Sequence, residues 1–193
     1  MKTGIINSEY KADKSLSSET ELENLSAKKK QKKIVIHEQK TLHQGYFRFG
    51  QLTISHSLYC GQDSEKIQRE IFQRGDAVVV LLYDLKAQCV ILVEQFRAGA
   101  AQKALQQQAP QTAWLLEPVA GMIDAGETPK QAAARESNEE TGANIQNLEF
   151  VAKYYPSPGA CDEELLMFAA EIDAKSVLKH AGNENEHEDI RVE

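Results

Sequence analysis

The chain has 193 residues, of which 41% are hydrophobic and 26% charged, a composition typical of one globular domain with a modest extension. No run of about 18 apolar residues is present and the N-terminus lacks the apolar core of a secretory signal, so we expect a cytoplasmic protein without a membrane-spanning helix. Of the net charge of −7, residues 1–33 contribute +3 (eight Lys, five acidic residues), so residues 34–193 carry −10, which argues against a general nucleic-acid-binding protein.

The spacing of the cysteines and the negative charge limit the kinds of site that this protein can contain. The three cysteines are far apart and form no CxxC pair, which argues against a disulfide framework and against a zinc site. An acidic protein binds an anionic substrate only where metal ions or local arginines reverse the electrostatic field at the site.

Two regions precede the main domain. Residues 1–33 are polar, rich in Ser, Lys and Glu, and without sustained periodicity, so we interpret them as a disordered tail. The lysine-rich run Lys28–Lys33 is typical of a solvated tail, with a nucleic-acid or localisation segment as the alternative. Residues 34–76 alternate in part between apolar and polar residues, most clearly in Tyr46–Tyr59, and predict a small antiparallel sheet. Ile67–Arg74 continues the strand pattern, with a short helix as the alternative.

Residues 77–193 form the predicted main domain. The apolar run Ala77–Tyr83 predicts a strand covered on both faces, and the Ala/Gln-rich stretch Ala98–Thr112 predicts a loop with a helical turn. Further strands are predicted at Cys89–Arg97, Trp114–Ala120, Leu148–Tyr155 and Glu164–Ile172. The sequence closes with an acidic loop, residues 182–193.

One helix, preceded by a glycine loop, has clear start and stop signals. Thr128 is a good N-cap, Pro129 fits the first helical position, and Gln131 completes a capping-box pattern. Gly142 fits the left-handed residue that ends a helix. The apolar residues between these ends are only three alanines, which is unusual for a structural helix.

The same helix carries Glu136, Glu139 and Glu140 in its last two turns. The helix dipole disfavours negative charge there, and the spacing of three and four residues places the later glutamates beside Glu136, where like charges repel. A hard divalent cation such as Mg²⁺, which prefers carboxylate oxygens, would compensate this repulsion. A solvated acidic face is the alternative.

This stretch resembles the Nudix box, whose pattern is G-x5-E-x7-R-E-U-x-E-E-x-G-U, with U an apolar residue. Its glycine and charged positions are all filled, by Gly121, Glu127, Arg135, Glu136, Glu139, Glu140 and Gly142. The one departure is Ser137, which stands at an apolar position. So many fixed positions at fixed spacing make the resemblance specific.

Other segments are similar to one branch of this family, the ADP-ribose pyrophosphatases. They begin at Arg69 (REIFQRGDAVVVLL), Val93 (VEQFRAGA), Trp114 (WLLEPVAGMIDAGE), Tyr155 (YPSPGACDE) and Glu184 (ENEHEDIRV). The resemblance covers residues 34–193. Members of this branch continue past the IRV segment with a strand and a final helix, so we expect the domain of residues 77–193 to be truncated at its C-terminal end.

The resemblance implies a fold and an activity. The fold is an α/β Nudix sandwich of α/β/α layers with a mixed sheet, preceded by a small antiparallel N-terminal sheet region. The activity is Mg²⁺-dependent hydrolysis of the diphosphate of ADP-ribose, or of a related nucleoside diphosphate sugar, to AMP and ribose 5-phosphate. Mn²⁺ is expected to substitute for Mg²⁺. The expected assembly is a homodimer. The alternatives are a hydrolase of another sugar nucleotide such as GDP-mannose, a Nudix domain that senses a ligand without cleaving it, and an inactive truncated product.

The resemblance also implies metal-binding and catalytic residues. The implied metal ligands are Glu136, Glu140, Glu188 and the carbonyl oxygen of Ala120. The implied catalytic residues are Glu186, Glu139 and Arg135. Glu186 is the implied general base on the attacking water, in an acidic loop that closes over substrate, with Glu184 and Glu188 as open alternatives. Glu139 is a ligand or its support, and Arg135 forms an orienting ion pair with Glu127.

Four residues are implied in substrate contact: Arg69, Glu70, Arg97 and Glu163. A guanidinium grips phosphate oxygens in a bidentate fashion, and a surface ion pair is the equal alternative for both arginines. Phe47, Phe72 and Trp114 are candidates for stacking on adenine, but aromatic residues at strand positions more often belong to the core.

Overall fold

The structure is a computed structural model, and it describes residues 32–183 and 187–193. The predicted tail of residues 1–33 therefore lies outside the described residues, except for its last two lysines. Glu184 and Glu186 of the acidic loop also lie outside them. In the part of the chain that is described, no helix is long and apolar enough to cross a membrane.

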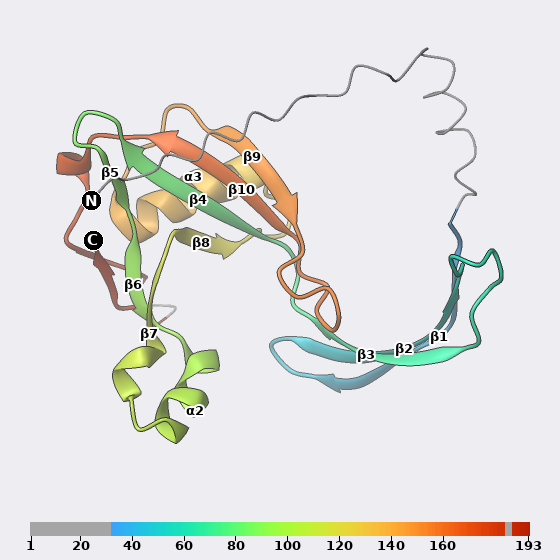
Figure 1. Ribbon diagram of the computed structural model, residues 1–193. Coiled ribbons are helices and arrows are strands. Elements are labelled where there is room, and N and C mark those ends of the chain that lie inside the picture. The colour runs from blue at the N-terminus through green and yellow to red at the C-terminus, as the bar shows by residue number, and fades with distance from the viewer. Residues whose placement is uncertain (1–31, 184–186) are drawn as a thin grey trace, which may run out of the picture.

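The N-terminal strands form a separate antiparallel sheet, which confirms that part of the predicted fold. β1 (Ile34–Gln44), β2 (Arg48–His56) and β3 (Ile67–Gln73) pair in this order. The segment for which a short helix was the alternative is therefore a strand. Figure 1 shows that the sheet extends away from the rest of the molecule.

One face of the N-terminal sheet is apolar. The cross-strand partners Ile36, Ile54 and Ile67 lie side by side on it, and Leu52 and Ile71 follow on the same face because side chains alternate along a strand. β1 is exposed along its whole length, and no apolar side chain of the three strands is fully buried. This sheet therefore has no core of its own.

The main domain is built on a mixed sheet, as predicted. Its central strand, β4 (Ala77–Asp84), pairs in parallel with β10 (Leu165–Glu171) and antiparallel with β5 (Cys89–Ile91) and β8 (Val119–Met122). β9 (Glu149–Tyr154) pairs antiparallel with the far side of β10. β8 occupies the first half of β4 and β5 the second half, so the glycine loop leaves the sheet at this edge.

A second, four-stranded sheet has the order β11-β12-β6-β7. Its strands are β6 (Val93–Phe96), β7 (Trp114–Glu117), β11 (His180–Ala181) and β12 (Ile190–Val192). Two stretches that the sequence predicts as single strands are each divided between the two sheets. One breaks at Leu92 and the other at Pro118, which has no N–H to continue a ladder.

The segment that follows β6 is more helical than predicted. α2 (Ala98–Gln106) and a 3-10 turn (Pro110–Ala113) replace the expected loop, because alanine has the highest helix propensity and the helix is alanine-rich. Figure 1 shows this segment projecting beyond the ends of β6 and β7. A second 3-10 turn, Ala174–Ser176, follows β10.

α3 (Pro129–Thr141) is the predicted helix, and both of its caps are confirmed. The side chain of Thr128 accepts a hydrogen bond from the backbone N–H of Gln131, and the side chain of Gln131 accepts one from the N–H of Thr128. Gly142 ends the helix with a φ of 72°.

The core lies between α3 and one face of the central sheet. Its buried members include Val78, Val80, Leu82, Phe168 and Ala170 of the sheet and Ala132 and Ala133 of the helix. Small side chains let the helix approach the sheet closely, so α3 is held firmly without a large apolar residue. Ser137, the departure from the box, is fully buried and donates its hydroxyl to the carbonyl of Ala133 at 2.7 Å, so its polar group is satisfied.

Candidate metal and catalytic site

The glycine loop and α3 meet where Gly121 faces Glu136. A Cβ atom added to Gly121 would lie 1.9 Å from Glu136 Oε1, so only glycine leaves room for this carboxylate against the backbone of β8. Burial raises the pKa of Glu136, and the charges of Glu139 and Glu188 act in the same direction. A nearby cation would therefore stabilise the ionised form of the Glu136 carboxylate.

Glu140 is the most enclosed of the helix carboxylates, with 1% of its surface exposed. Its Oε2 accepts a hydrogen bond from the N–H of Ala120 at 3.2 Å, and its Oε1 accepts one from the side-chain amide of Gln95 at 3.3 Å. Burial raises the pKa of Glu140 to about 8, and the charges of Glu136 and Glu188 contribute to the increase. A bound cation would favour the ionised form of such a group.

Arg135 joins the glycine loop to the helix carboxylates. Its Nε and Nη2 donate to the two oxygens of Glu127, each at 3.0 Å. Its Nη1 donates to Glu136 at 2.7 Å and to Glu139 at 3.0 Å, and Nη2 also donates to the carbonyl of Met122 at 3.0 Å. The hydrogen bonds from Arg135 hold the pKa of Glu127 below its usual range. The structure therefore contains the expected ion pair between Arg135 and Glu127.

The base of the acidic loop lies against the C-terminal end of α3. The N–H of Gly182 donates to the carbonyl of Glu139 at 3.3 Å. Gly182 has a φ of 112°, and a Cβ atom there would lie 2.8 Å from the carbonyl oxygen of Glu188, so glycine is required for this turn. The charge of Glu188 raises the pKa of both Glu136 and Glu140, which places its carboxylate in their electrostatic neighbourhood.

Comparison with known proteins identifies the family. The family model of the NUDIX domain matches residues 73–193. The chain belongs to the Nudix family. An ADP-ribose pyrophosphatase of Haemophilus influenzae is 39% identical over 162 residues, which cover 84% of this chain and 73% of that protein. An ADP-ribose pyrophosphatase of Escherichia coli strain K12 is 38% identical over 152 residues, with coverage of 79% and 70%.

Two further similarities are weaker. A GDP-mannose pyrophosphatase of Pectobacterium atrosepticum is 37% identical over 124 residues, which cover 64% of this chain and 61% of that protein. A crystal structure of an ADP compounds hydrolase matches with a TM-score of 0.52 at 21% identity, over 72% of this chain and 67% of that one. At this level of identity the structural match supports the Nudix fold alone.

Nudix hydrolases generally use a divalent metal such as Mg²⁺, and the residues of this Nudix chain fit one. The converging side chains are carboxylates, the hard oxygen donors that Mg²⁺ prefers. Within residues 32–183 and 187–193, no group of three or more His, Cys, Asp or Glu side chains forms a ready ligand set. Two of the helix carboxylates, Glu136 and Glu139, are engaged by Arg135.

The residues implied in substrate contact do not all lie near α3 within this chain. Arg69 and Glu70 are exposed on β3, in the sheet that extends away from α3 (Figure 1), and as neighbours on a strand they point to opposite faces. Arg97, which follows β6, is closer to the helix carboxylates in the fold because Gln95 of β6 touches Glu140. Its Nε donates to Glu117 at 2.8 Å.

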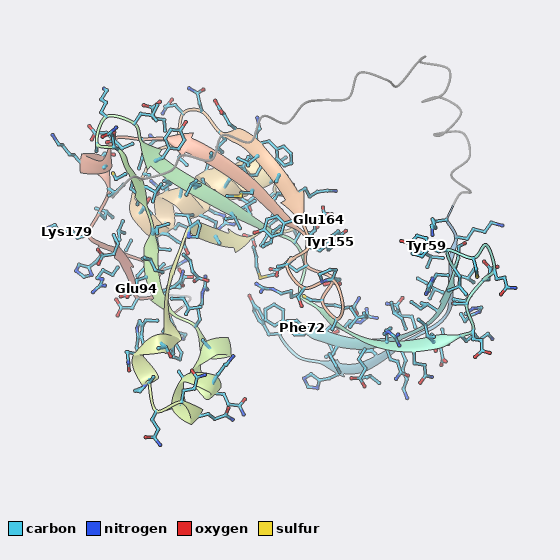
Figure 2. All side chains as sticks on the ribbon, viewed as in Figure 1. Tyr59, Phe72, Glu94, Tyr155, Glu164 and Lys179 are labelled. Carbon is cyan, nitrogen blue, oxygen red and sulfur yellow. The ribbon has the colours of Figure 1, made fainter. Side chains whose placement is uncertain are left out.

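The loop between β9 and β10 connects the N-terminal sheet to the Nudix domain. Phe72 exchanges two backbone hydrogen bonds with this loop, at 2.7 and 3.1 Å. Glu163, the fourth residue implied in substrate contact, is 9% exposed and pairs with Arg74 at 3.3 Å. Figure 2 shows Phe72 below this loop and Tyr155 and Glu164 close together at its upper end. Glu163 therefore lies at the junction between the two regions.

Two of the three aromatic candidates, Trp114 and Phe72, lie at the surface, so the interpretation that they belong to the core is wrong for these two. Trp114 is 49% exposed and packs against Phe96, with ring centroids 5.2 Å apart. Phe72 is 36% exposed and packs edge-on against Phe47 at 5.1 Å.

Sequence reasoning missed two residues that shape this site. Gln95 is 5% exposed and contacts Glu140, and Gly182 shapes the base of the acidic loop. A signal for Gln95 was present, because an amide within an apolar strand must find a hydrogen-bond partner when the strand is buried. Gly182 carried only the general preference of glycine for turns.

Proposed function

We propose that this Nudix protein hydrolyses the diphosphate of ADP-ribose to AMP and ribose 5-phosphate with Mg²⁺, for which Mn²⁺ is a substitute. The observation that carries the proposal is the enclosed carboxylate of Glu140. It lies beside Glu136, whose own carboxylate fits only because residue 121 of β8 is glycine. The ADP-ribose pyrophosphatases at 38–39% identity, matched over 70–73% of their length, support ADP-ribose as the substrate.

The residues proposed to hold the metal are Glu136, Glu140, Glu188 and the carbonyl oxygen of Ala120. When bound, the metal neutralises charge on the diphosphate and acidifies the attacking water. Arg135 keeps Glu139 and Glu127 in place through its fork of hydrogen bonds. Glu186, which lies outside the described residues, is the proposed base that accepts the proton of the water, with Glu184 and Glu188 as the alternatives.

Arg97, Arg69, Glu70 and Glu163 are proposed to contact the substrate. Arg97 would exchange its ion pair with Glu117 for the phosphate oxygens, because a guanidinium binds both kinds of anion in the same fork geometry. Since β3 extends away from α3 of its own chain (Figure 1), Arg69 and Glu70 would serve a site on a second copy.

A homodimer is the assembly that this arrangement favours. The apolar face around Ile36, Ile54 and Ile67 has no layer packed on it among the described residues, and Ile36 is 57% exposed. Covering such a face is worth roughly 25 cal/mol for each Å² of apolar surface removed from water. A second copy of the chain would cover it.

The test is to measure hydrolysis of ADP-ribose, GDP-mannose and other nucleoside diphosphate sugars with Mg²⁺ and to identify the products. We expect the highest kcat/KM for ADP-ribose, with AMP and ribose 5-phosphate as products. A preference for GDP-mannose would support the other enzyme activity, which the match to a GDP-mannose pyrophosphatase favours. Binding without turnover by the folded protein would support a ligand-sensing domain.

A further inference from the structure

We propose that Gln95 is a positioning residue that orients the carboxylate of Glu140 and joins the two halves of the metal site. The inference rests on the proposed function, because it assigns Gln95 a role toward the metal that Glu140 is proposed to hold. It adds a residue that lies outside the box and outside the acidic loop.

Gln95 lies in the sheet between the neighbouring strands β7 and β12. Its backbone lies in β6, where it pairs with Leu115 of β7 on one side and with Ile190 of β12 on the other. Ile190 follows Glu188 by two residues, so β12 carries the end of the acidic loop directly to β6. The side chain of Gln95 points inward, is 5% exposed, and reaches α3 at Glu140. One residue thus contacts both carboxylate-bearing segments.

Two hydrogen-bond donors, from β6 and β8, hold the carboxylate of Glu140. The Nε2 of Gln95 and the N–H of Ala120 donate to different oxygens of Glu140, at 3.3 and 3.2 Å. Two donors on two oxygens define the plane of the carboxylate, and each oxygen keeps a lone pair for a further partner. The orientation of Glu140 is therefore set by β6 and β8 together.

The side chain that donates to Glu140 from β6 carries no charge. A lysine or arginine at this position would neutralise Glu140 and compete with a divalent cation for it. A glutamine amide orients the carboxylate and leaves its negative charge available. Burying an amide within an apolar strand is unfavourable unless it is hydrogen-bonded, so the contact with Glu140 accounts for a glutamine at this position.

The test compares Mn²⁺ binding by Gln95→Met and by the wild-type protein, followed by the EPR signal of free Mn²⁺. Methionine keeps the length of the side chain and removes the donor. We expect about a tenfold loss of Mn²⁺ affinity or more, the usual effect of removing a partner that orients a metal ligand. Gln51→Met, on β2 of the N-terminal sheet, is the matched control and should bind Mn²⁺ like the wild type.

Two measurements separate the possible outcomes. Glu140→Gln must lose Mn²⁺ affinity; if it does not, the proposed metal site itself is wrong. If Glu140→Gln loses affinity while folded Gln95→Met binds Mn²⁺ as the wild type does, only the role of Gln95 is overturned. A second test needs no variant of Gln95: in the wild-type protein its side-chain amide NMR signals should shift during Mg²⁺ titration, while those of Gln51 stay fixed. Unshifted Gln95 signals would also overturn the inference.

Discussion

The N-terminal sheet and the central sheet are built from similar residues and used in opposite ways. In β4, which lies at the middle of the central sheet, Val78, Val80 and Leu82 are completely buried under α3. In β1, at the edge of the N-terminal sheet, Ile34 and Ile36 are 74% and 57% exposed. The apolar content of a strand therefore indicates that a face will be covered, but it does not identify the layer that covers it.

This difference in packing separates the functions that one chain performs alone from those that require a second copy. The helix carboxylates, Arg135 and the glycine loop are held by a core that lies within one chain. A three-stranded sheet without a packed layer gains its stability from contacts beyond itself. We therefore expect metal binding to depend on the first region, and assembly and substrate contact by Arg69 and Glu70 to depend on the second.

The largest expected effect comes from Glu140→Gln in the core region. It should lower kcat/KM for the metal-dependent reaction on the order of 10³-fold, or roughly 4 kcal/mol, because it removes a buried metal ligand. Steady-state kinetics with ADP-ribose and Mg²⁺ measures this effect. Glu171→Gln, at the exposed end of β10, is the control and should be unchanged. Full metal-dependent hydrolysis by Glu140→Gln would rule out the proposed site.

The next effect is a dependence of stability on pH in the metal-free protein. The pKa of Glu140 is about 8 in the folded chain and 4.5 ordinarily, so between these values the folded state holds a proton that the unfolded state releases. The unfolding free energy should therefore fall as pH rises from 4.5 to 8, at up to about 1.4 kcal/mol per pH unit. Urea unfolding with a chelator measures it. Glu140→Gln should show a flatter dependence, and an equally steep one would contradict this assignment.

A somewhat smaller effect is expected from Gly121→Ala. The added methyl group meets the carboxylate of Glu136, so we expect weaker Mn²⁺ binding and a loss of about 1–3 kcal/mol in stability. Gly99→Ala is the matched control, because an added Cβ there meets nothing within 4 Å. Because Gly99 lies in the first turn of α2, this control should leave stability and Mn²⁺ binding close to those of the wild type. Equal effects of the two substitutions would show that the loop tolerates a side chain.

The smallest effect on the Nudix core is expected from Ile36→Asp in the N-terminal sheet, which tests whether the apolar face of that sheet serves assembly. A charge on the apolar face should weaken self-association at least about tenfold, or about 1.4 kcal/mol, in sedimentation equilibrium. Mn²⁺ affinity should not change. Val35→Asp is the control, since Val35 is also exposed and points to the opposite face of the same strand. If both variants associate like the wild type, the apolar face is not the dimer interface.

Much of the fold could be predicted because its signals are local. The capping box at Thr128 and Gln131 and the left-handed Gly142 depend on a few neighbouring residues, so the bounds of α3 follow from the sequence. The strand breaks at Leu92 and Pro118 were missed because a strand that moves from one sheet to another looks continuous in its apolar pattern. Only the missing N–H of Pro118 marked one of them beforehand.

The site was predictable where residues act through fixed spacing. Glu136, Glu139 and Glu140 share one helix, so their proximity is a property of the helix itself. Gln95 was not predictable in this way, because its contact with Glu140 depends on how β6 lies against α3. The division between Arg69 and Glu70, which occupy opposite faces of β3, also required the strand register.

The parallel pairing of β4 with β10 bears on the order in which the protein folds. Ala77 pairs with Leu165, and α3 lies between them in the chain, so this pairing closes a long loop that contains the helix. Long-range parallel pairing is slow because the chain loses the entropy of a large loop before any stabilising contact between the strands forms. β12, which brings Glu188, joins β6 from still later in the chain. In a refolding experiment, Mn²⁺ binding should therefore appear after the helical circular dichroism signal, and it would report completion of both sheets.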